Sequence, residues 1–156
     1  MKKVLIALDY DHTAKKVADS GYALARALGA QVTLVHVIAD PVYYSTTDYS
    51  PIIGFVGFMD TGQFQLDSID GLKGVSQHFL DKIKHHLSDT NIQTQVKEGD
   101  FADAILRTAK EKNADVIVIG SHSRRWLEEV LMGSVTEKVL HHTTVPLFIV
   151  PTKKPK

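Results

Sequence analysis

Short, continuous apolar runs recur along this chain and are typical of strands that are covered on both faces. These runs occupy residues 4–8, 32–38, 116–119 and 145–150. A fifth candidate strand, residues 92–96, alternates apolar and polar residues instead. Alternation leaves one face of a strand to solvent, so we expect this strand to be half exposed or to form an edge of the sheet.

Between the apolar runs, apolar residues return with the period of an amphipathic helix. Four such stripes are present, at residues 13–28, 69–87, 101–109 and 134–142. Gly29 is suited to end the first helix, and Asp100 to cap the start of the third. Gly71 and Gly74 weaken the expected first turns of the second. Strands that alternate with helices predict an α/β fold with a parallel sheet and helices on both faces.

Ligands of such sheets bind beyond the carboxyl ends of the strands, where the strand order reverses. Asp9 follows the first strand, Gly120 ends the fourth, and Gly133 with Ser134 opens the last helix. A glycine turn followed by a helix start offers backbone N–H groups and the positive end of a helix dipole to a phosphate. The local pattern therefore favours a phosphate-containing ligand, although the GxxxxGK[ST] loop of P-loop NTPases is absent.

The amino-acid composition disfavours several classes of function. The chain has 156 residues, with 18 Lys+Arg against 18 Asp+Glu. A net charge of zero argues against a broad electrostatic grip on nucleic acid or on an anionic membrane. There is no cysteine and no apolar run long enough to span a bilayer. We expect a cytoplasmic protein with one domain at residues 1–151 and a disordered tail at 152–156.

Four segments of the chain, taken together, form one pattern of residues and spacings. The first strand ends in Ile6-Ala7-Leu8-Asp9, the second contains Val35-His36-Val37, and the last reads VPLFIVP. Gly120 is followed after two residues by Ser123 and, after nine more, by Gly133-Ser134. In order and spacing these segments resemble the universal stress protein family, and the similarity runs essentially end to end.

The resemblance implies a five-stranded parallel sheet in the order 3-2-1-4-5, Rossmann-like, and a homodimer through the last strand, from Val145 to Val150. Family members with the full glycine motif usually bind ATP, and members that lack it usually do not. Ser123 stands where the motif has its second glycine. We favour the ATP-binding branch, because a serine hydroxyl is small and can donate a hydrogen bond to a phosphate.

The resemblance also implies a nucleotide site, with adenine near Asp9 and Val37 and the phosphates on backbone N–H groups of the two glycine segments. Mg²⁺ or Mn²⁺ would accompany the phosphates. The full expected set is Ala7, Asp9, Val37, Ile119, Gly120, His122, Ser123, Arg124, Gly133, Ser134, Val135 and Thr136. The adjacent histidine pairs at 85–86 and 141–142 point to different helix faces, so we expect no metal site built from histidines.

Two functions stay open at this stage. The first is an ATP-binding, dimeric sensor or signalling module of the stress response; slow ATP hydrolysis is left open, since no general base can be named. The second is a nucleotide-free dimeric interaction protein, favoured by Ser123 and the bulky Trp126. An adenylyl-transferring enzyme is disfavoured, because its HIGH-type and SGGxDS-type motifs are absent. The aromatic segment 40–62 could cover a nucleotide, bind a partner or pack over the sheet.

Overall fold

The computed structural model describes residues 1–10, 12–38, 69–121 and 133–152. Its elements in chain order are β1 (Lys3–Ala7), α1 (Ala14–Leu28), β2 (Gln31–Ile38), α4 (Ile69–Leu87), β3 (Gln93–Glu98), α5 (Phe101–Lys112), β4 (Val116–Gly120), α6 (Ser134–His142) and β5 (Leu147–Val150). The strands form one parallel sheet in the order β3-β2-β1-β4-β5. The predicted fold class and strand order are therefore confirmed.

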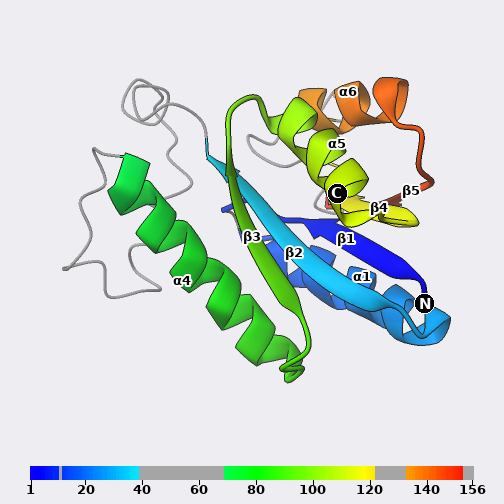
Figure 1. Ribbon diagram of the computed structural model, residues 1–156, viewed down its shortest axis with the longest axis horizontal. Helices are drawn as coiled ribbons and strands as arrows, with labels where there is room; N and C mark the ends of the chain where they lie inside the picture. Colours follow the sequence, from blue (N-terminus) through cyan, green and yellow to red (C-terminus); the bar gives the residue numbers. More distant parts are fainter. Residues whose placement is uncertain (11, 39–68, 122–132, 153–156) are drawn as a thin grey trace.

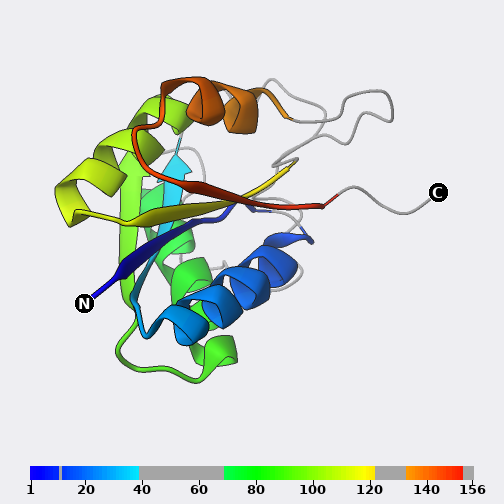
Figure 2. The ribbon, with the colours of Figure 1, turned by 90° about the vertical axis from the view of Figure 1, so that its right-hand side faces the viewer.

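Helices cover both faces of this sheet, with α1 and α4 on one side and α5 and α6 on the other (Figure 1 and Figure 2). Successive side chains of a strand point to opposite faces. Val4 and Ile6 of β1 accordingly join the core under α1 and α4, whereas Leu5 and Ala7 join the core under α5 and α6. This double burial explains why the central strands read as unbroken apolar runs.

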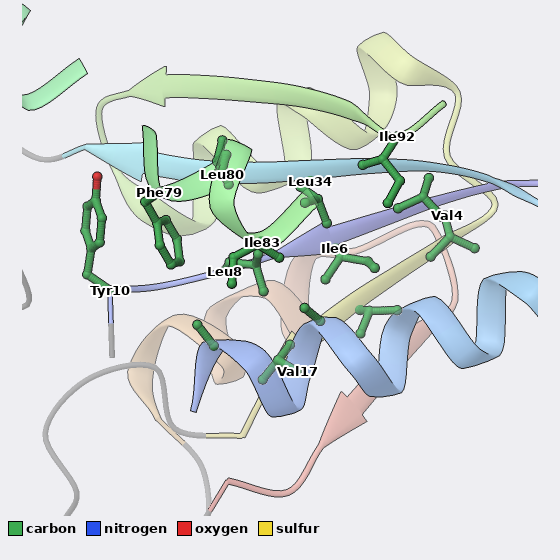
Figure 3. Close-up of a cluster of buried hydrophobic side chains, with 14 of the residues drawn as sticks. Val4, Ile6, Leu8, Tyr10, Val17, Leu34, Phe79, Leu80, Ile83 and Ile92 are labelled. Atoms are coloured by element: carbon green, nitrogen blue, oxygen red, sulfur yellow. The ribbon is translucent and has the colours of Figure 1, made fainter. Parts of the chain in front are cut away.

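The larger of the two cores lies between the sheet and the α1–α4 layer. Figure 3 shows Ile6 and Leu34 of the sheet with Leu80 and Ile83 of α4 and Val17 of α1. The packing of α4 also explains why Gly71 and Gly74 do not delay its start, which is at Ile69. Burial of an amphipathic face stabilises a helix more than intrinsic propensity does.

Two local signals of the sequence are confirmed by the backbone. Gly29 adopts a left-handed conformation, with φ 62°, and its N–H is directed to the carbonyl groups of Ala25 and Arg26. Asp100 caps α5, because its carboxylate accepts a hydrogen bond of 3.0 Å from the Asp103 N–H. The end of α1 and the start of α5 therefore lie where Gly29 and Asp100 predict them.

The two edge strands start later than expected. β3 begins at Gln93 and lies at an edge, as its alternating pattern predicts. β5 begins at Leu147 rather than at Val145, because Pro146 has no N–H and the Val145 N–H donates instead to the Thr143 hydroxyl at 3.0 Å. Within the described ranges, none of the helices combines the length and apolarity that a bilayer-crossing segment needs.

Candidate functional site

A pocket opens at the carboxyl ends of β1, β2 and β4, where the strand order reverses between β1 and β4. Parallel α/β sheets bind their ligands at this kind of position. The strand ends and the first turns of α1, α5 and α6 line the pocket. Its described lining is Ala7, Leu8, Asp9, Thr13, Ala14, Val17, Val35, His36, Val37, Phe101, Ile105, Ile119, Gly120 and Val135.

The structure brings many of the predicted site residues together in this lining: Ala7, Asp9, Val37, Ile119, Gly120 and Val135. Gly133, Ser134 and Thr136 lie at the start of α6, beside Val135. Predicted residues His122, Ser123 and Arg124 lie outside the described residues, as do Trp126 and the aromatic segment 40–62.

Sequence reasoning missed the helical side of the pocket. α1 contributes Ala14 and Val17 to the lining, and α5 contributes Phe101 and Ile105. These residues belong to apolar stripes that look like ordinary core in the sequence. One signal in the sequence could have found Phe101. This residue directly follows the Asp100 cap, which places it at the start of a helix near the strand ends.

The chain beyond β1 is held in place by backbone and side-chain hydrogen bonds. The Leu8 N–H donates to the Val35 carbonyl at 2.9 Å, and Asp9 Oδ1 accepts from the Tyr10 N–H at 2.8 Å. His36 Nδ1 lies 2.9 Å from the Leu8 carbonyl, and since a carbonyl only accepts, Nδ1 carries the hydrogen. The buried His36 ring also packs edge-on against Tyr10, with 4.1 Å between ring centroids. His36 thus has a structural role.

Gly120 is needed for packing. A β-carbon at this position would lie 3.0 Å from Thr152 Cγ2 and 3.1 Å from Val17 Cγ2. Both contacts are tighter than ordinary van der Waals distances, so a side chain here would push β4 away from α1 and from the chain after β5. This glycine is therefore explained without a ligand, although its position also opens the pocket.

The start of α6 lies beside the pocket, and part of its polar chemistry is used within the protein. The Gly133 N–H donates to the Ser121 carbonyl at 2.6 Å, and the buried Thr136 hydroxyl donates to the Gly120 carbonyl at 2.7 Å. Gly133 has φ −67° and ψ 156°, which any residue can adopt. The donors that remain for a ligand are the N–H groups of Ser134, Val135 and Thr136, which have no acceptor within α6.

The N-terminus of α5 is capped by the carboxylate of Asp100. Hydrogen bonding from the Asp103 N–H, and then from Lys138 Nζ at 3.0 Å, lowers the pKa of Asp100. Asp100 in turn raises the pKa of Lys138 through their hydrogen bond. Because Lys138 belongs to α6, this ion pair joins the two helices next to the pocket.

Within the described ranges, no group of three or more histidine, aspartate or glutamate side chains is placed to hold a metal ion. The two histidines of the pair 141–142 have separate partners. In this second pair, His141 Nε2 lies 3.8 Å from Glu137 Oε1, whereas His142 Nδ1 lies 2.9 Å from the Lys138 carbonyl oxygen. These contacts agree with the expected divergence of neighbouring side chains on a helix.

Comparison with known proteins gives the class of this protein. The model of the universal stress protein family matches residues 1–151, and the chain belongs to that family. The chain is 32% identical over 157 residues to universal stress protein MJ0531 of Methanocaldococcus jannaschii, a match that covers 99% of the chain and 84% of the relative. It is 26% identical over 155 residues to MJ0577 of the same organism, covering 97% of the chain and 96% of the relative.

Solved structures show the same fold. The structure of MJ0577 superposes with a TM-score of 0.72 at 25% identity, over 99% of this chain and 98% of that one. A universal stress protein in complex with cAMP superposes with a TM-score of 0.63 at 18% identity, over 97% of both chains. The family thus includes a member that binds a nucleotide.

Proposed function

We propose that this universal stress protein binds ATP, with Mg²⁺ or Mn²⁺ on the phosphates, in the pocket at the carboxyl ends of β1, β2 and β4. The observation that carries the proposal is the meeting of Asp9, Val37, Gly120 and Val135 around one pocket at the reversal of strand order. These residues are far apart in the sequence, and the sequence pattern predicts each of them at the site.

The pocket lining and the adjacent start of α6 suit different parts of a nucleotide. Val37, Ala7 and Ile119 give apolar walls for a base, and the half-buried Asp9 carboxylate offers an acceptor to ribose hydroxyl or adenine amino hydrogens. The phosphates would face the N–H groups of Ser134, Val135 and Thr136. The positive end of the α6 dipole favours negative charge there.

The relative in complex with cAMP supports a nucleotide as the ligand class. Its low identity leaves the choice between ATP and other adenine nucleotides to experiment. Titration calorimetry with ATP, ADP, AMP and cAMP, each with and without Mg²⁺, tests that choice. We expect ATP with Mg²⁺ to bind most tightly; cAMP binding as tightly as ATP would contradict a site built for a triphosphate.

We propose a sensor or signalling module rather than a fast enzyme. Among the described lining residues, Asp9 and His36 are the titratable side chains, and both take part in hydrogen bonds that hold the chain after β1. A general base must reach the proton it removes. Slow hydrolysis is checked by following ADP release over hours, with the Asp9→Asn variant as comparison.

A homodimer through β5 completes the proposal. The sheet order gives β5 a single strand neighbour, β4, among the described residues, and the exposed fractions of Phe148 and Leu140 are 39% and 43%. An apolar edge strand invites pairing, and a second copy across a two-fold axis would cover it in a closed assembly.

Analytical ultracentrifugation tests the dimer. Phe148→Lys places a charge on the proposed interface and should shift the protein to monomer at micromolar concentration. Leu28→Lys is the matched control, because Leu28 is equally exposed, at 44%, and ends α1. A wild-type protein that is monomeric at micromolar concentration would contradict the proposed interface.

The second candidate function is a nucleotide-free interaction protein of the same family. It is favoured by Gly120, which packing alone explains, and by the Gly133 N–H, which is already bonded to Ser121. Mass spectrometry of the small molecules released on denaturation separates the two functions. No nucleotide released, and no heat with millimolar ATP from a protein that still dimerises, would favour this second function.

A further inference from the structure

Ser121, the residue after β4, is bonded to two other segments. Its N–H donates to the Val150 carbonyl at 2.9 Å, and its carbonyl accepts from the Gly133 N–H at 2.6 Å. Its Oγ accepts from the Thr152 N–H at 3.0 Å and lies 3.3 Å from Thr152 Oγ1. One buried serine thus joins the end of β4, the end of β5 and the start of α6.

Thr152 completes this junction from beyond the last strand. The sequence predicts that Thr152 belongs to a disordered tail, yet its exposed fraction is 6%, and that of Ser121 is 8%. Its Cγ2 fills the space that a side chain at Gly120 would need. The Gly120 carbonyl, in turn, accepts the Thr136 hydroxyl of α6. Gly120 therefore packs against Thr152 and is also hydrogen-bonded to α6.

We propose that Ser121 and Thr152 are positioning residues of the nucleotide site, an inference that rests on the proposed function. The described lining of the pocket includes Gly120 and Val135 but neither Ser121 nor Thr152. Their effect on a ligand is indirect: they fix the start of α6 against the end of β4. The N–H groups of residues 134–136 are thereby aimed at one place before a phosphate arrives.

Such positioning matters because N–H donors stabilise an anion only when they converge on it. A donor displaced by about 1 Å loses much of its interaction, and prior fixation removes the ordering cost from binding. The hydroxyl chemistry is specific. Ser121 Oγ is the acceptor of a buried backbone N–H, which would be left without its partner in Ser121→Ala.

Three variants and one control separate positioning from general stability. Ser121→Ala removes the central acceptor; Thr152→Val keeps the shape and loses one hydroxyl; Thr152→Ser keeps the hydroxyl. Thr108→Val is the control, because it also deletes a buried hydroxyl, which donates to the Ala104 carbonyl at 2.7 Å within α5. Thr108 lies outside the pocket lining and outside the junction.

The first measurement needs no ligand. Hydrogen–deuterium exchange should show the Gly133 and Glu137 amides of Ser121→Ala exchanging about tenfold faster than in the wild type, because these amides hold the α6 start. Amides of α4 should exchange as before, and Thr108→Val should leave Gly133 and Glu137 unchanged. Unchanged Gly133 and Glu137 amides in Ser121→Ala, or equal acceleration throughout the molecule, would overturn the proposal.

The second measurement is ATP affinity by calorimetry in one buffer. We expect affinity to fall about tenfold for Ser121→Ala and about threefold for Thr152→Val, with Thr152→Ser and Thr108→Val within about twofold of the wild type. Equal affinities across the set would overturn the proposal. A wild-type protein that binds no nucleotide contradicts the proposed function instead, and the exchange result then decides the positioning role alone.

Discussion

Two neighbouring helices, α5 and α6, begin beside the same pocket but begin differently. They pack on the same face of the sheet, and Phe101 of α5 and Val135 of α6 both line the pocket (Figure 1). α5 starts with the Asp100 carboxylate, which accepts the Asp103 N–H. α6 starts with Gly133, which has no side chain to offer.

The difference shows which helix start is available for a ligand. The positive end of the α5 dipole already faces a carboxylate that also pairs with Lys138, so an anion would gain little there. The first turn of α6 contributes Val135 to the pocket lining, and its N-cap Gly133 supplies no such carboxylate. The chain thus satisfies one helix start internally, and the other is the one we propose for phosphate.

The largest expected effect comes from making α6 begin like α5. Gly133→Asp supplies an N-cap carboxylate that would accept the N–H groups meant for phosphate and repel its charge. We expect ATP affinity to fall at least about a hundredfold, since like charges about 4 Å apart repel by about 4 kcal/mol near a protein surface. Folding should change by only about 0.3 kcal/mol, because glycine is itself an acceptable N-cap.

Gly133→Asn is the matched control, because asparagine caps as well as aspartate but carries no charge. Its affinity should fall less than that of Gly133→Asp, and calorimetry of both variants measures the gap. Equal affinity of Gly133→Asp and wild type would show that α6 does not hold the phosphates.

A moderate effect is expected at the start of α5. Asp100→Ala removes the cap and one end of the ion pair with Lys138, and should lower the free energy of unfolding by about 1 kcal/mol. Urea unfolding measures the change. Asp103→Asn is the control, since it removes the weaker charge contact to Lys138, at 3.5 Å, and keeps the cap. A loss in Asp103→Asn as large as in Asp100→Ala would contradict the cap's role.

The smallest effect concerns pH. The pKa of Asp100 is lowered in the folded state, chiefly by the hydrogen bond from the Asp103 N–H, so folding favours the charged carboxylate. Its contribution is therefore complete above the ordinary pKa of aspartate and is lost as pH falls through the lowered folded-state value. Because Asp100 is half exposed, the contribution is only about 0.5 kcal/mol.

Urea unfolding of the wild type and Asp100→Asn at neutral and acidic pH checks this effect. The stability difference between the two proteins should be present at neutral pH and should shrink as the carboxyl is protonated in acid. A difference that stays constant across this range would show that the charge of Asp100 contributes nothing.

The sequence predicts most of this fold because its elements follow from local patterns. Unbroken apolar runs identify the strands that are buried on both faces, and the alternation in β3 predicts its place at an edge. Asp100 and Gly29 mark helix ends by chemistry that needs no tertiary context. The start of β5 was misplaced because a single Thr143 side chain competes with the strand for the Val145 N–H.

The site is harder to predict from the sequence than the fold, because its details depend on contacts between segments that are distant in the sequence. Gly120 resembles a phosphate-loop glycine, yet its fit against Thr152 and Val17 becomes visible only in space. Thr136 resembles a ligand contact, yet its hydroxyl is bonded to the Gly120 carbonyl. Positioning residues that do not line the pocket, such as Ser121, have no local sequence pattern that would reveal this role.

The most direct test of nucleotide binding is calorimetric titration of the purified wild-type protein with ATP and Mg²⁺, after any bound nucleotide has been removed by unfolding and refolding. We expect saturable heat with one site per chain, and its loss in Gly133→Asp. No heat at millimolar ATP, from a protein with a native circular dichroism spectrum and no nucleotide bound on purification, would contradict it.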